Sequence, residues 1–140
     1  MKLARRTAAV TAVTVVVSGS ALALAGPASA AESVGPVATY NGACGTGYKV
    51  IDSADMENLG TTFLTYNKTT GENCVVTVRA RAGAPVYMFA SLSSPREGKA
   101  TDNGRFTTYA GPVYLQARGQ CVTWEGGITT YSTSATGHCG

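Results

Sequence analysis

Four cysteines constrain this chain more than any other feature of its sequence. Cys44, Cys74, Cys121 and Cys139 all lie beyond residue 40. An even number of cysteines in a small exported domain is typical of a disulfide framework. No two of them lie about two to four residues apart, the spacing that zinc ligands need, so we expect no metal site and no cofactor.

The four cysteines allow three pairings. We predict Cys44–Cys74 and Cys121–Cys139, because each of these bridges closes a compact stretch and together they tie down both ends of the domain. In the loop-entropy model each bridge contributes about 3–4 kcal/mol. That is a large share of the net stability of a domain of this size.

The N-terminus has the three-part pattern of a secretory signal peptide. A positively charged start (residues 2–6) precedes an uncharged run of Ala, Val, Thr and Leu (residues 7–25). Ala28-Ser29-Ala30 then places small side chains at the positions that signal peptidase reads. An uncleaved membrane anchor is the alternative, but the run is not Leu-rich. We therefore predict that residues 1–30 are cleaved and meet the membrane only during export.

Removing the signal peptide changes the charge of the chain. The full sequence has 11 Lys and Arg against 8 Asp and Glu, and three of the cations lie in residues 1–30. The remaining 110 residues are formally neutral. Binding of nucleic acid needs a surplus of clustered cations, so we expect no nucleic-acid partner. We divide this exported part into a loose N-terminal segment (31–40) and a disulfide-stapled domain (41–140).

The domain is patterned for β-strands, and no stretch has a convincing helical period. In residues 74–81 apolar side chains alternate with others, which predicts a half-buried strand with Cys74 on its core side. A similar alternation predicts an inward row at Val86, Met88, Ala90 and Leu92. Further strands are predicted over residues 48–52, 61–66, 106–109, 113–117, 121–124 and 128–131. Many short strands bounded by turns predict an all-β fold, a small antiparallel sandwich or barrel-like domain with two disulfides.

Two stretches of the domain are predicted to lie outside strands. Residues 94–105 contain Pro, two Gly and Asp102-Asn103, which predicts an exposed loop containing a turn at Asp102-Asn103-Gly104. Residues 53–59 carry a weak signal for one short helix, with Ser53 as its N-cap.

No arrangement of residues points to catalysis. The single histidine, His138, lies third from the chain end, and no Gly-x-Ser-x-Gly motif is present. Asp52 and Asp55 lie close together, and Glu125 follows Trp124, as carboxylates in glycosidases can. However, eight acids spread over 110 residues produce such neighbours by chance. We expect no catalytic residues and no enzymatic activity.

The aromatic residues allow a binding hypothesis. Seven tyrosines and one tryptophan are many for so small a domain, and such rings on an open sheet face stack on sugars or meet a protein surface. We name Trp124, Tyr109 and Tyr114 as candidate contacts to a glycan or a protein partner. The alternative is that these rings fill the core, and we favour it for Trp124 because indole rings are highly buried on average.

Four motifs, with all four cysteines in register, carry a resemblance to a known family. They are Tyr40-Asn41-Gly42-Ala43-Cys44-Gly45, Phe63-Leu64-Thr65-Tyr66-Asn67, Asn73-Cys74-Val75-Val76-Thr77-Val78-Arg79 and Tyr109-Ala110-Gly111-Pro112-Val113-Tyr114. In these motifs the chain resembles the spore-associated protein A family of sporulating actinobacteria. The resemblance implies a small secreted protein found with spores or aerial hyphae. It brings no catalytic residues.

Three functions are consistent with these features. The first is a secreted, non-enzymatic protein at the spore or hyphal surface, whose partner is a surface or cell-wall component such as a glycan. The second is a secreted inhibitor of an enzyme, for which residues 98–105 would supply a rigid loop. The third is a carbohydrate-binding module that uses Trp124 and nearby tyrosines.

The signal-peptide interpretation predicts the N-terminus of the exported protein. Signal peptidase is expected to cut after Ala30, so N-terminal sequencing of the exported chain should begin at Ala31-Glu32-Ser33. Recovery of the uncut chain in the membrane fraction would favour the anchor instead.

Overall fold

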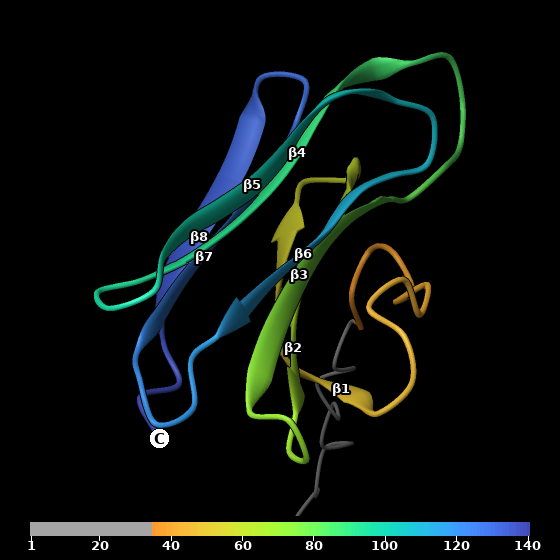
Figure 1. Ribbon diagram of the computed structural model, residues 1–140. Helices are drawn as coiled ribbons and strands as arrows, with labels where there is room; N and C mark the ends of the chain where they lie inside the picture. The colour runs from red at the N-terminus through yellow and green to blue at the C-terminus, as the bar shows by residue number, and fades with distance from the viewer. Residues whose placement is uncertain (1–34) are drawn as a thin grey trace, which may run out of the picture. The chain divides into compact units, whose positions relative to one another are not determined.

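The computed structural model describes residues 35–140, and the predicted signal peptide lies outside them. These residues form eight strands in two antiparallel sheets (Figure 1). The strands are β1 (Tyr48–Met56), β2 (Gly60–Asn67), β3 (Glu72–Arg79), β4 (Val86–Ser94), β5 (Gly98–Phe106), β6 (Tyr109–Gln116), β7 (Val122–Ile128) and β8 (Tyr131–Gly137). The predicted all-β fold is confirmed. Within residues 35–140 no helix is long and apolar enough to cross a membrane.

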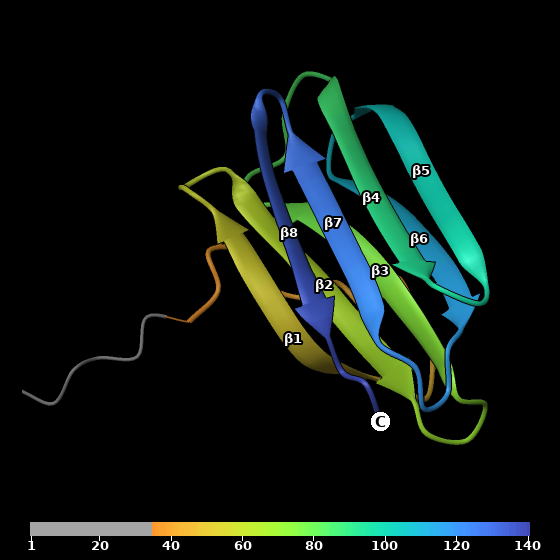
Figure 2. The same ribbon diagram turned by 90° about the vertical axis from the view of Figure 1, so that its left-hand side faces the viewer.

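The two sheets lie face to face as a sandwich. We call β1-β2-β3-β6 sheet A and β5-β4-β7-β8 sheet B, each in its spatial order. Hairpins join β1 to β2, β2 to β3, β4 to β5 and β7 to β8, while the other connections cross between sheets. Figure 2 shows sheet B in front, with β1 behind β8 and β6 behind β5.

A core of apolar side chains fills the space between the sheets. Sheet A contributes Leu64 and Val75, and sheet B contributes the row predicted on β4, of which Met88, Ala90 and Leu92 are completely buried. Trp124 on β7 is also buried here, with 1% of its surface exposed. Burial of a side chain of this size is worth a few kcal/mol at roughly 25 cal/mol per Å² of apolar surface.

A second apolar cluster lies on the opposite face of sheet A. It contains Phe63, Cys74, Val76 and Val78, packed against residues 38–48 of the preceding chain. The prediction that Cys74 faces the main core is therefore wrong. β2 and β3 are central strands that are covered on both faces, and their other alternate residues, such as Val75, meet sheet B.

Both predicted disulfides are present. Cys44–Cys74 joins the chain before β1 to β3, and Cys121–Cys139 joins the connection between β6 and β7 to the C-terminal residues. The first bridge ties the irregular chain before β1 to a strand, and the second ties the irregular C-terminal residues to the residue just before β7. Both irregular segments, which lack ladder hydrogen bonds, are therefore held covalently.

The predicted loop over residues 94–105 is wrong, because most of it is β5. Its nine residues pair with β4 from Val86↔Phe106 to Ser94↔Gly98, and only residues 95–97 form the turn. The inward positions of β5 include Ala100, Asp102 and Gly104, which are too small or too polar to produce a visible hydrophobic alternation. Asp102-Asn103-Gly104, predicted as a turn, lies in the middle of this strand.

Three further local predictions are wrong. Residues 53–59 form no helix: β1 continues to Met56, and residues 57–59 are a turn to β2. Residues 106–109 are not one strand, because Phe106 ends β5 and Tyr109 begins β6. Residues 128–131 are not one strand either: Ile128 ends β7, Tyr131 begins β8, and Thr129 between them lies in the left-handed region at φ 58°. In all three places pairing across the sheet decided the outcome over local sequence preference.

The sheets come closest at Gly126 on β7. A Cβ atom there would lie 1.8 Å from Thr62 Oγ1 and 2.8 Å from Thr62 Cβ. The Thr62 and Thr77 hydroxyls hydrogen-bond to each other at 3.1 Å beneath this glycine. Because Thr62 Cβ is fixed to the backbone of β2, rotating the hydroxyl alone cannot make room for a methyl group.

We therefore expect Gly126→Ala to lower the free energy of unfolding by about 1–3 kcal/mol through overpacking. Chemical denaturation measures this loss. Gly104→Ala is the matched control, because Gly104 also faces inward from a strand of sheet B but the nearest atom to its added Cβ is 3.5 Å away. Equal losses in the two variants would contradict the close approach.

Candidate functional site

The outer face of sheet A is closed by the chain that precedes β1. We call residues 37–47 the covering segment. The Ala38 N–H donates to Thr61 Oγ1 at 2.9 Å, the Tyr40 ring meets Phe63 edge-on at 5.6 Å between ring centroids, and Cys44 is bonded to Cys74. These contacts reach from the β1–β2 end of sheet A to the start of β3, so the segment shields the second apolar cluster from solvent.

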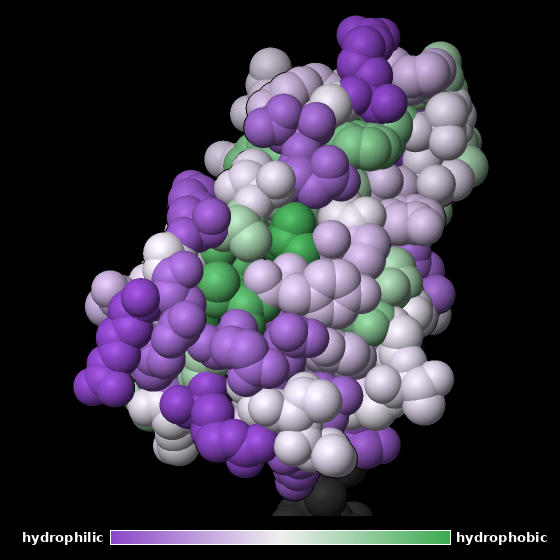
Figure 3. All heavy atoms as spheres, viewed as in Figure 1, coloured by the Kyte–Doolittle hydropathy of each residue, from purple (hydrophilic) through white to green (hydrophobic). Residues whose placement is uncertain are grey.

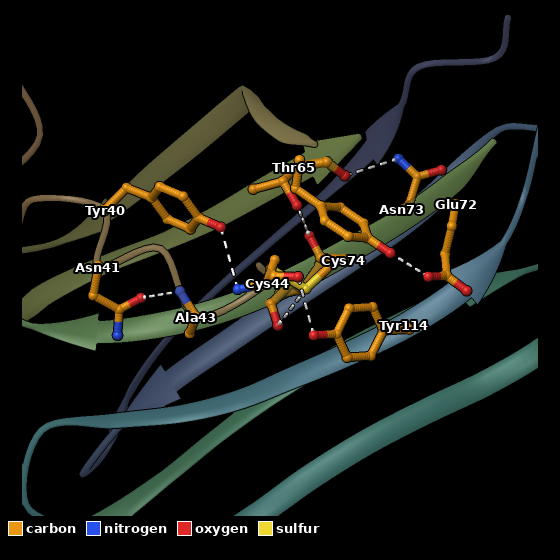
Figure 4. The surroundings of a disulfide bond; sticks show 11 residues. Tyr40, Asn41, Ala43, Cys44, Thr65, Glu72, Asn73, Cys74 and Tyr114 are labelled. Carbon is orange, nitrogen blue, oxygen red and sulfur yellow. Dashed lines mark hydrogen bonds between the residues drawn. A yellow bond between two sulfur atoms is a disulfide. The ribbon is translucent and has the colours of Figure 1, made fainter. Parts of the chain in front are cut away.

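Tyrosine hydroxyls fix the path of the covering segment around the disulfide (Figure 4). The Cys44 N–H donates to the Tyr40 hydroxyl at 3.3 Å, and the Tyr114 hydroxyl donates to the Cys44 carbonyl at 3.2 Å. The Tyr48 hydroxyl donates to the Glu72 carboxylate. Burial and this hydrogen bond raise the pKa of Tyr48 well above its usual range, so its hydroxyl keeps the proton that it donates.

The predicted contacts Tyr109 and Tyr114 both lie on β6, beside the covering segment. Both face outward from sheet A, opposite Val78 and Cys74 respectively, and they are 38% and 39% exposed. Tyr114 packs edge-on against Tyr48 at 5.7 Å between ring centroids and also holds Cys44. Its hydroxyl therefore has a structural role, while Tyr109 borders a shallow hollow beside Arg79.

The prediction that Trp124 is a third surface contact is wrong. Its side chain points from β7 into the core between the sheets, where it is 1% exposed. The alternative that this indole fills the core is confirmed. The structure therefore does not bring Trp124 together with Tyr109 and Tyr114, which lie on the far face of the other sheet.

The outer face of sheet B carries no covering segment among the described residues. We call it the open face. Its side chains alternate with the core row along each strand, and most are hydroxyl or amide groups. They are Tyr87, Phe89, Ser91 and Ser93 on β4, Lys99, Thr101, Asn103 and Arg105 on β5, Thr123 and Glu125 on β7, and Ser132, Ser134 and Thr136 on β8.

Two aromatic rings lie together at one end of the open face. Tyr87 is 48% exposed, and its ring centroid lies 6.4 Å from that of Phe89. Phe89 lies over Gly127 of the neighbouring strand, where an added Cβ would be 2.1 Å from the Phe89 ring. The lack of a side chain at Gly127 thus lets the ring lie down on the sheet.

Hydroxyl groups across the rest of the open face are held by cross-strand hydrogen bonds. Ser91 pairs with Thr101 at 3.0 Å, and Thr123 pairs with Thr136 at 2.7 Å. Among the charged side chains, Lys99 is paired with Glu125 at 2.8 Å, and the Arg105 guanidinium is held by a backbone carbonyl but has no carboxylate partner in residues 35–140. The face is therefore close to neutral and ordered before anything binds.

The candidate carboxylates do not form a catalytic pair. Asp52 and Asp55 point to opposite faces of β1, and each has its own partner: Asp52 contacts His138 at 2.9 Å, and Asp55 accepts hydrogen bonds from Thr61 and the Val37 N–H. Glu125 is held by Lys99 on the open face. Within residues 35–140 no three metal-ligating side chains gather at one place.

The loop expected of an inhibitor is also absent, because residues 98–105 are paired with β4 as an edge strand. Sequence analysis missed Tyr87 and Phe89 as a site although it predicted their strand. The available signal was that Tyr87 and Phe89 alternate with the inward row of β4 and so lie on its outer face. The sequence did not indicate that β5 and β7 lie on either side of β4 and complete the open face.

A known relative resembles the chain over most of its length. Spore-associated protein A of Streptomyces coelicolor is 47% identical over 111 residues, which cover 79% of this chain and 72% of the relative. The chain belongs to the spore-associated protein A family. No family model and no solved structure matches it.

Membership of the spore-associated protein A family agrees with the two disulfides, which persist in oxidising surroundings. For this family member, the structure adds an asymmetry between its two outer faces. Sheet A is closed by the covering segment and the Cys44–Cys74 bridge, while sheet B presents an ordered, nearly neutral surface.

Replacing both Cys44 and Cys74 by Ala should loosen the covering segment. We expect the free energy of unfolding to fall by about 2–5 kcal/mol, and the native protein to bind a hydrophobic dye because Phe63, Val76 and Val78 become accessible.

The matched control removes the other bridge, with Cys121→Ala and Cys139→Ala. It should also lose stability, but without dye binding by the native protein, because that bridge covers no apolar face. Equal dye binding by both double variants would contradict the covering role of the segment.

Proposed function

We propose that this member of the spore-associated protein A family is a secreted, non-enzymatic protein that attaches to the spore or hyphal surface by binding a neutral polysaccharide on its open face. The proposal rests on one observation above all: within residues 35–140, only the outer face of sheet B is both free of a covering segment and lined with ordered hydroxyl groups beside an exposed aromatic ring, that of Tyr87.

The chemistry of the open face suits a sugar better than other ligands. Sugars present hydroxyl groups at their edges and C–H groups on their faces, so they match a surface that combines polar groups with aromatic rings. Thr101 and Thr123 can each donate or accept hydrogen bonds, while the buried Ser91 holds the Thr101 hydroxyl in place. The neighbouring charges of Lys99 and Glu125 cancel, which leaves one cation on the face, Arg105, too little to select for a strongly charged ligand.

The shape of the open face suits an extended chain rather than a small molecule. Pairing between β4 and its neighbours places the side chains in regular rows across four strands, and the hollows found in the described residues lie at other places. A surface with such rows and without a deep hollow contacts several units of a polymer weakly, and the contacts add along the chain.

The experiment measures retention of the purified protein on washed spores, on hyphal walls and on insoluble polysaccharides such as chitin and cellulose. Tyr87→Ala is expected to weaken retention about tenfold, because it removes the most exposed ring of the open face.

Tyr109→Ala is the matched control, since Tyr109 is a similarly exposed tyrosine on the other sheet and forms no side-chain hydrogen bond within the described residues. Retention should remain at the level of the unmodified protein. Loss of retention with Tyr109→Ala and not with Tyr87→Ala would overturn the assignment of the open face. Failure of the unmodified protein to bind any of these materials would refute surface attachment.

A further inference from the structure

The sandwich ends in four edge strands, and their free backbone groups can pair with another chain. Sheet A ends in β1 and β6, and sheet B ends in β5 and β8. Natural proteins guard such edges with charged side chains, proline or β-bulges, because an unguarded edge is a template for strand addition. Three of the four edges here are guarded in this way.

β5 and β6 guard each other along one side of the sandwich. Asp102 points inward from β5, and its carboxylate accepts the backbone N–H of Gly111 on β6 at 2.8 Å. The next residue, Pro112, has no N–H. Figure 3 looks onto this side and shows some apolar surface among polar side chains. Ala100, Phe106 and Leu115 of the two strands are partly buried and pack against the main core.

β1 is guarded by irregular backbone and by charge. Its pairing with β2 shifts between Val50 and Asp52, which marks a bulge at Ile51. Lys49, Asp52 and Asp55 add charges along the same strand. A bulge and charged side chains both disfavour a regular ladder with a new strand.

β8 has none of these devices. Its sequence, Tyr-Ser-Thr-Ser-Ala-Thr-Gly over residues 131–137, contains no charge and no proline. Its pairing with β7 runs without a register shift from Val122↔Gly137 to Ile128↔Tyr131. Ser132, Ser134 and Thr136 are exposed on the open face, and no strand of residues 35–140 pairs with the other side of β8, so its outward backbone groups can hydrogen-bond there.

We propose that β8 pairs with β8 of a second copy of this chain, antiparallel, about a two-fold axis at Ser134. This register uses the whole strand: Ser132 lies opposite Thr136 of the other copy, and Thr133 lies opposite Ala135. Tyr131, which is 49% exposed, then lies opposite Gly137, around which an added Cβ would meet no atom within 4 Å. An aromatic ring over a cross-strand glycine is a favourable pair in a sheet.

The same two-fold pairing is unfavourable at the other edge of sheet B. About the middle of β5, Asp102 would lie opposite Asp102 of the second copy, and Lys99 would lie opposite Arg105. Like charges directly opposite each other destabilise a strand pair. On β1 the equivalent axis would bring Asp52 opposite Asp52. The fourth edge, β6, has no charges but is interrupted by Pro112. β8 is therefore the edge at which two copies meet with neither like-charge repulsion nor a proline in the ladder.

Pairing at β8 makes a closed dimer. Each copy uses its unguarded edge once, so assembly stops at two. Sheet B becomes one continuous eight-stranded sheet, and the open faces of both copies point to the same side. This arrangement would let two copies bind one surface together, but the pairing itself does not depend on what the open face binds.

The test measures the mass of the protein in solution by sedimentation equilibrium, from about 1 µM to about 1 mM, a range that detects weak self-association. The unmodified protein is expected to form a dimer within this range. Ser134→Lys places two ammonium groups opposite each other at the axis and should weaken dimerisation by more than about tenfold. Asn103→Lys, on the open face of the opposite edge strand, should leave dimerisation unchanged.

The register has its own test. Ser134→Cys should give a covalent dimer on a non-reducing gel, because directly opposed residues in antiparallel strands have Cα atoms about 4.5–5.5 Å apart, within the range of a disulfide. Ser132→Cys should not, since each new cysteine would face Thr136.

A monomer throughout the concentration range, assembly beyond the dimer, or a dimer that survives Ser134→Lys would each overturn the proposal. None of these outcomes bears on binding to polysaccharide, which is read from retention.

Discussion

The cover over the outer face of sheet A is the constraint on which the rest of the structure depends. β2 and β3 bury side chains on both faces, so one sheet-to-sheet core cannot cover them completely. The covering segment buries the second face, and Cys44–Cys74 holds it there at its most buried point. Since this segment has no ladder hydrogen bonds of its own, the covalent bond and the tyrosine hydroxyls replace them.

This cover also decides which surfaces are left for function. With sheet A closed, the ordered outer surface that remains is the open face of sheet B, where hydroxyl groups are fixed by one another and Lys99 is paired with Glu125. The ordering matters for binding, because side chains that are already fixed lose little conformational entropy when a ligand arrives. The free edge at β8 borders the same face, so attachment and pairing of copies would act on one continuous surface.

Several elements could be predicted from sequence because their signals are local. The inward row of β4 and the strands on either side of Cys74 follow from period-two alternation. The disulfide pairs follow from the positions of the cysteines at the two ends of the domain. β5 was missed because its inward residues are small or polar, and an edge strand needs less apolar surface than a central one.

The sequence by itself determined that this is an all-β domain with two bridges, because alternation and cysteine spacing are properties of short stretches. Only the tertiary structure decided which alternate set of β3 faces the other sheet, that Trp124 is buried, and that Tyr87 and Phe89 lie on an uncovered surface. When a strand has apolar residues on both faces, its own sequence does not show which face will meet the other sheet. The choice is made by what packs on each face, and those partners come from distant parts of the chain.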